Sequence, residues 1–185
     1  MATPAASLPP ATPSLDAHTL QRIRLLLGLF ITGLVLSGLT AFPLRGELAL
    51  MQQWLSAAGV AQSAPSLYAW ITYVHDGLVY SQQHYPFLAY GTDWLGFAHL
   101  VIATAFWGPY RDPVRNRWVI QWGMLSCGLV FPLALICGPL RGIPFFWRLI
   151  DCSFGLLGVI PLAIANTLIA RAVHATGMRP RTVTR

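Results

Sequence analysis

The stretch IRLLLGLFITGLVLSGLTAF, residues 23–42, decides the class of this protein. Arg24 is its only charged residue, and most of the others are Leu, Ile, Val, Phe and Gly. A helix rises about 1.5 Å per residue, so a helix of this length crosses a hydrocarbon core of roughly 30 Å. The stretch therefore predicts a transmembrane helix in an integral membrane protein.

The composition of the whole chain agrees with this prediction. Of its 185 residues, 55% are hydrophobic and only 10% are charged, whereas a soluble domain carries roughly 25% charged residues. The net charge of +6 comes from arginines that flank the apolar stretches. Because they form no exposed basic stripe with aromatic residues, we expect contacts with membrane lipids and none with nucleic acid.

Three further apolar stretches are long enough to cross a membrane: residues 93–110, 118–138 and 149–170. Pro132 and Pro161 fall inside the last two and predict kinks, which a membrane bundle tolerates. The sequence thus predicts an all-α integral membrane protein with a bundle of four transmembrane helices.

The interval 43–91 has a different character, because it is rich in Tyr, Trp and polar residues. Glu47–Ala58 and Ser66–Gln83 have apolar residues at helical spacing. They predict one or two amphipathic helices at the membrane surface, with aromatic rings at headgroup level. The alternative is a fifth, imperfect span through Tyr68–Tyr80, which would bury a histidine and an aspartate.

Nine of the twelve arginines fall on one side of the four predicted spans: Arg22, Arg24, Arg111, Arg115, Arg117, Arg171, Arg179, Arg181 and Arg185. Arg45, Arg141 and Arg148 fall on the other side. The excess of Arg marks the cytoplasmic side. We therefore predict a bacterial inner membrane protein with both termini in the cytoplasm, and with the surface helices of interval 43–91 on the periplasmic side.

The same pattern gives a prediction for the domain organisation. Residues 1–21, rich in Ala and Pro, form a disordered cytoplasmic tail. Residues 22–172 form a single membrane domain, and residues 173–185 form a basic cytoplasmic tail.

The polar residues that are costly in a membrane protein gather on the predicted periplasmic side. We predict that they line a ligand-binding pocket with aromatic walls. The predicted ligand-binding residues are His75, Asp76, His84, Asp93, His99, Arg141, Arg148 and Asp151.

His99 stands out because it follows Asp93 by six positions in an apolar stretch, roughly 9 Å from the helix end. One interpretation is an imidazole hydrogen-bonded to a carbonyl or hydroxyl on a neighbouring helix. Others are proton transfer to a lipid-soluble substrate, or ligation of haem b with His75 as the second axial ligand. The haem pattern is incomplete, because no two helices each carry two histidines.

The stretch GPLRGIPFFWRLID, residues 138–151, is the most unusual one locally. Arg148 and Asp151 are three residues apart, so they lie on one helical face and can pair. The stretch is either an interfacial anchor, with its aromatic rings in the headgroups, or a site where Arg141 and Arg148 bind an anionic group.

No catalytic motif is recognisable, so the sequence leaves open whether the protein is an enzyme. Cys127, Cys137 and Cys152 lack metal-site spacing, so we predict no metal site apart from the haem alternative, and Cys137 with Cys152 is a conceivable disulfide.

The leading function hypothesis is a small multi-pass protein that binds a lipid-like or other amphipathic small molecule near the outer leaflet. The first alternative is a non-catalytic subunit or assembly factor, with protein partners in the membrane. Small-residue stripes would seat the partner helices: Gly33/Ser37, Gly123/Cys127 and Cys152/Gly155/Gly158. The second alternative is a haem b electron-transfer protein.

Overall fold

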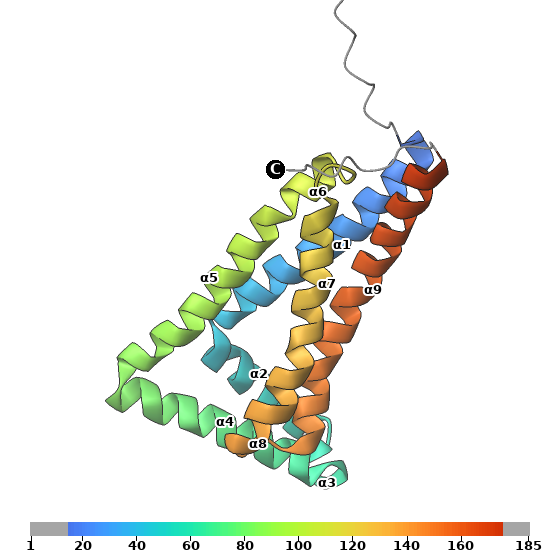
Figure 1. Cartoon of the computed structure of the whole chain (residues 1–185). Coiled ribbons are helices and arrows are strands. Elements are labelled where there is room, and N and C mark those ends of the chain that lie inside the picture. Colours follow the sequence, from blue (N-terminus) through green and yellow to red (C-terminus); the bar gives the residue numbers. More distant parts are fainter. Residues whose placement is uncertain (1–14, 176–185) are drawn as a thin grey trace, which may run out of the picture. The chain divides into compact units, whose positions relative to one another are not determined.

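The computed structural model describes residues 15–175, and all regular elements in that range are helical (Figure 1). The elements are α1 (Ala17–Ala41), α2 (Leu44–Ala57), α3 (Val60–Ser63), α4 (Pro65–His84), η1 (Pro86–Leu88), α5 (Ala89–Ala105), α6 (Trp107–Arg111), α7 (Arg117–Pro132), the π-helix η2 (Leu133–Cys137), α8 (Gly138–Leu140) and α9 (Phe145–Ala175). The prediction of an all-α protein is confirmed.

Three helical segments in the described range are long and apolar enough to cross a membrane: α1, the segment Arg117–Leu140 and α9. They cover three of the four predicted spans. The stretch 93–110 is divided between α5 and α6, because the helix is interrupted at Phe106. α4 has 20 residues but is not among the three, so the fifth span finds no support.

Helix α1 begins at Ala17, ahead of the predicted start at Ile23, because Asp16 caps it. The Asp16 carboxylate accepts a hydrogen bond from the backbone N–H of Thr19 at 2.9 Å, and this bond lowers the pKa of the exposed carboxyl. Helix α9 continues to Ala175, into the predicted basic tail. The rest of both predicted tails, 1–14 and 176–185, lies outside the described residues.

The chain divides into two compact units. Unit 1 combines the chain up to Phe30 with the chain from Phe106 onward, and unit 2 is Ile31–Ala105. The first half of α1 therefore belongs to unit 1 and its second half to unit 2. The predicted single membrane domain over residues 22–172 stays a prediction.

Unit 1 is built on α7 and α9, which run side by side (Figure 1). They approach closely because small residues face each other. A Cβ atom added to Gly155 would lie 2.6 Å from the backbone oxygen of Cys127, and one added to Gly158 would lie 2.9 Å from the Cys127 sulfur. The first half of α1 joins this pair, with the rings of Phe30 and Phe106 4.7 Å apart.

Two of the helix contacts in unit 2 concern the predicted site residues. In the first, α2 packs on α4, with Leu48 and Ile71 buried, and the side chain of Gln52 donates a hydrogen bond to Thr72 Oγ1 at 2.8 Å. In the second, the later half of α1 crosses α5, where a Cβ atom on Gly38 would lie 2.8 Å from the carbonyl oxygen of Gly96.

Much of the surface of the long helices is apolar and exposed. Leu25 on α1 is 69% exposed, Leu129 on α7 57% and Leu157 on α9 64%. A soluble monomer rarely shows contiguous apolar patches of this kind. Such surfaces suit a lipid environment, in agreement with the three membrane-capable helices.

Candidate functional site

The turn between η2 and α9 combines a π-helix, a short helix and a left-handed glycine. Helix α8 closes with a Schellman motif: the N–H of Ile143 donates to the carbonyl of Gly138 at 3.0 Å, and that of Gly142 to Pro139 at 3.1 Å. Gly142 has φ +69°, a left-handed conformation that favours glycine. The π-helix directly before this turn is a feature often found at functional sites.

Arg148 is the central side chain of this turn. It lies in the first turn of α9, and its side chain extends back over Gly138. The absence of a Cβ on Gly138 leaves the space for it, because an added Cβ would clash with Arg148 Cδ. The guanidinium carbon is 5.1 Å from the centre of the Phe145 ring. Arg148 Nε is buried and has no hydrogen-bond partner among residues 15–175.

The ion pair that the spacing of Arg148 and Asp151 allows is not formed. Within the described range the only ion-pair contact is between His75 and Asp76. Side chains on a helix lean toward its N-terminus, so Arg148 points toward Gly138 and Phe145, while Asp151 lies one turn further along. The cation is thus held by packing and not by a carboxylate.

Arg141 supplies a second cation at this turn. Its backbone N–H donates to the carbonyls of Cys137 and Gly138, both at 3.1 Å, while its exposed guanidinium has no partner among the described residues. Around the two arginines the surface is apolar: Leu140 is 78% exposed and Phe145 60%. The turn therefore combines unneutralised positive charge with an apolar rim, and we call it the α8 site, defined as residues 138–151.

The other five predicted site residues belong to unit 2. His75 contacts its neighbour Asp76, with 3.2 Å between Nδ1 and Oδ1; the His75 side chain is 20% exposed and that of Asp76 70%. His84 stacks on Tyr80 with ring centres 4.1 Å apart and bonds the Tyr80 carbonyl through Nδ1 at 3.0 Å. Asp93 is partly exposed on α5.

His99 lies at the crossing of α1 and α5. A Cβ on Gly38 would be 3.1 Å from His99 Cβ. Its bonding partner differs from the prediction, because Nδ1 bonds the carbonyl of Leu95 in the same helix at 2.8 Å. Since a carbonyl only accepts, Nδ1 carries the proton, and in a neutral ring Nε2 keeps its lone pair.

Metal and disulfide chemistry find little support in the part of the chain that the structure describes. No group of three or more His, Cys, Asp or Glu side chains there is placed to hold a metal ion. Cys137 is an exposed free thiol and Cys152 a buried one, so the conceivable disulfide is not formed. Haem ligation by His75 and His99 stays a prediction.

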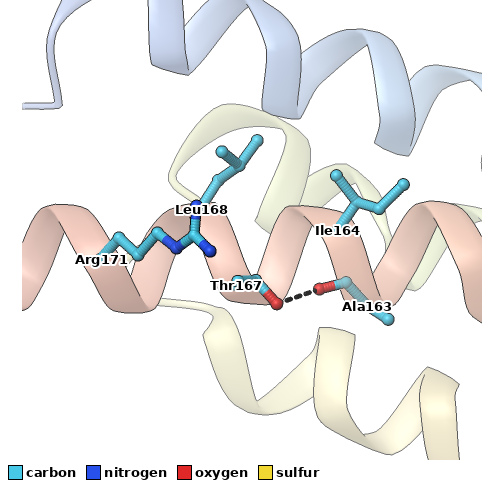
Figure 2. Close-up of a pocket in the computed structure, with 5 residues that line it drawn as sticks. All are labelled: Ala163, Ile164, Thr167, Leu168 and Arg171. Atoms are coloured by element: carbon cyan, nitrogen blue, oxygen red, sulfur yellow. Dashed lines mark hydrogen bonds between the residues drawn. The ribbon is translucent and has the colours of Figure 1, made fainter.

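An open hollow of about 320 Å³ lies on one face of α9 and was not predicted from the sequence; we call it the α9 hollow. Figure 2 shows its five lining residues, all on this helix: Ala163, Ile164, Thr167, Leu168 and Arg171. Their spacing of three, four and seven residues places them on one helical face. That spacing was visible in the sequence, but lipid-facing residues follow the same pattern.

In chemical terms, the α8 site offers hydrogen-bond donors with positive charge beside exposed apolar side chains. This combination suits an anionic group attached to an apolar body. The chain matches no family model, no curated protein and no solved structure.

Proposed function

We propose that this protein binds an amphipathic small molecule with an anionic head group at the α8 site. One observation carries the proposal: Arg148 is packed against Gly138 and Phe145, and its guanidinium forms no hydrogen bond or ion pair with any residue of the range 15–175. Its Nε is buried, so a ligand meets the two terminal nitrogens. An anionic oxygen bound to these nitrogens would form a charge-assisted hydrogen bond.

The apolar rim of the α8 site supports a lipid-like body for the ligand. Leu140, Phe145 and Leu149 are each more than half exposed beside the arginines. A free inorganic anion would not cover these apolar side chains, whereas the acyl or isoprenoid part of an amphipathic molecule would bury them. Arginine suits the head group because its planar guanidinium binds phosphate or carboxylate through two parallel hydrogen bonds.

A direct binding assay tests this function. We expect the purified full-length chain in mild detergent to bind oleoyl lysophosphatidate better than monooleoylglycerol, which has the same acyl chain but no phosphate. Arg148→Gln should weaken lysophosphatidate binding at least about tenfold, because it removes a charge-assisted bond. Native mass spectrometry measures the fraction of protein with bound lipid. Every protein compared in this assay carries Arg171→Gln, so that the arginine beside the α9 hollow does not contribute to binding.

Arg111→Gln is the matched control, because Arg111 is an exposed arginine of unit 1 on α6. It should change binding less than twofold. Arg148→Lys should restore only part of the affinity, since an ammonium group lacks the planar fork. Equal binding of the two lipids, or equal losses in the Arg148 and Arg111 variants, would refute the proposal.

The finer membrane topology belongs to the same proposal. We propose that α5 and α6 together form a fourth span, since they cover residues 89–111 with only a local irregularity at Phe106. The distribution of arginines supports an orientation with both termini in the cytoplasm and the α8 site on the periplasmic side of a bacterial inner membrane. In this arrangement α2 and α4 lie at the periplasmic surface.

Cysteine labelling in intact cells tests this topology. In a Cys137→Ser background, which removes the exposed native thiol, we expect Gln62→Cys to react with a membrane-impermeant maleimide. Val114→Cys, in the turn between α6 and α7, should react only after the membrane is permeabilised. The reverse labelling pattern would invert the orientation and move the α8 site to the cytoplasmic side.

A further inference from the structure

The α9 hollow combines an apolar floor with a single cation. Ile164 is 45% exposed, and the hydroxyl of Thr167 is satisfied because it donates to the carbonyl of Ala163 at 2.8 Å. Arg171 forms no hydrogen bond or ion pair with any residue of the range 15–175. In Figure 2 the Arg171 side chain extends along α9 toward Leu168, another residue that lines the hollow.

The apolar face continues beyond the hollow along α9. Leu157 and Ile160 precede Ile164 on this face at helical spacing and are 64% and 48% exposed. An extended hydrocarbon chain that begins beside Arg171 can therefore follow one apolar stripe of the helix. A head group alone would use only Arg171.

The end of unit 1 that carries Arg171 has a strong excess of positive charge. Within residues 15–175, six arginines lie on the ends of α1, α6, α7 and α9 that meet here or in the turn between α6 and α7: Arg22, Arg24, Arg111, Arg115, Arg117 and Arg171. Two of them bond neutral oxygens: Arg24 Nε donates to the Tyr110 carbonyl at 3.2 Å, and Arg117 Nε to Asn166 Oδ1 at 2.7 Å. These bonds fix the positions of the two arginine side chains but do not neutralise their positive charge.

The two aspartates of this end, Asp16 and Asp112, are fewer than its six described arginines and leave an excess of positive charge. The Asp16 carboxylate accepts the N–H of Thr19 at 2.9 Å, and Asp112 accepts the N–H of Arg115 at 3.1 Å. Neither forms an ion pair with an arginine among the described residues. The field of this end therefore attracts anions.

From these observations we infer that the α9 hollow binds an anionic phospholipid, with one acyl chain along Ile164 and Leu168 and the phosphate on Arg171. The apolar hollow selects a lipid over a free phosphate, and the uncompensated arginines select an anionic head group over a zwitterionic one. This site is distinct in its residues from the α8 site and does not depend on the ligand proposed there.

Native mass spectrometry of the purified, delipidated full-length chain tests this inference with two probes, dioleoylphosphatidylglycerol and dioleoylphosphatidylcholine. All chains carry Arg148→Gln, so that failure of the α8 site and failure of the α9 hollow are distinguishable. We expect phosphatidylglycerol to bind more tightly. Arg171→Gln should weaken its binding about fivefold, the effect of one basic residue near an anionic surface.

Arg111→Gln is again the matched control, since Arg111 contributes to the same positive end but does not line the hollow; it should change binding less than twofold. Ile164→Trp fills the hollow and should weaken phosphatidylglycerol binding while leaving Arg171 in place. Glycerophosphoglycerol, the head group without acyl chains, should not compete. Equal binding of both lipids, equal effects of the two arginine variants, or full competition by the head group would overturn the inference.

Discussion

Replacing Gly38 by leucine is expected to destabilise unit 2 by about 3 kcal/mol, near the upper end of overpacking effects. A Cβ at this position would lie 2.8 Å from the carbonyl oxygen of Gly96 and 3.1 Å from His99 Cβ. The first of these atoms belongs to the backbone of α5, so it cannot rotate away as a flexible side chain would. The helices can accept the leucine only by moving apart.

Gly33→Leu on the same helix is the control, because an added Cβ there meets nothing within 4 Å. The measurement is the temperature at which the detergent-solubilised protein loses its monodisperse peak in size-exclusion chromatography. A destabilisation of this size corresponds to a decrease of roughly 10 °C for Gly38→Leu, and Gly33→Leu should stay within about 2 °C of the native protein. Equal melting temperatures for the two variants would show that α1 and α5 do not cross at Gly38.

The membrane-capable helices were predictable from the sequence because length and apolarity alone decide them. Residues 23–41, 118–138 and 149–170 lie in such helices. The ends were less accurate, since they depend on local bonds: Asp16 caps α1, and Gly142 closes α8. The stretch 93–110 looked continuous by apolarity, but its helix is interrupted at Phe106, which packs in the core of unit 1.

The candidate sites were less predictable because they depend on contacts between distant residues. Arg148 and Asp151 share a helical face in sequence, but the space above Gly138 and the ring of Phe145 draw Arg148 the other way. His99 Nδ1 bonds the carbonyl of Leu95, one turn earlier in the same helix, and not a group on a neighbouring helix. Spacing identifies which residues share a face, but not which neighbour each side chain contacts.

The small-residue stripes can contact either helices of this chain or helices of a partner protein, and the tertiary contacts distinguish the two. In unit 1 they are occupied by the chain itself. Gly123 faces Phe106 and Leu162, and Gly158 faces Phe30. The subunit hypothesis therefore loses this support in unit 1, while Gly33 on α1 remains open.

Gly155→Leu decides between these two uses of the stripe on α9, and we expect it to lower stability by about 3 kcal/mol in the isolated protein. Its Cβ would lie 2.6 Å from the backbone oxygen of Cys127 and 3.2 Å from Val130 Cβ. Gly128→Leu on α7 is the control, because an added Cβ there meets nothing within 4 Å.

The melting temperature of the detergent-solubilised chain again gives the measurement, with a decrease of roughly 10 °C expected for Gly155→Leu and almost none for Gly128→Leu. If the stripe seats a partner helix instead, Gly155→Leu leaves the isolated chain as stable as the native one and removes a protein that co-purifies from membranes. That result would favour the subunit hypothesis. Loss of stability without loss of a partner shows that Gly155 is needed for the close approach of α7 and α9, which also brings the ends of these helices, and with them the α8 turn, into place.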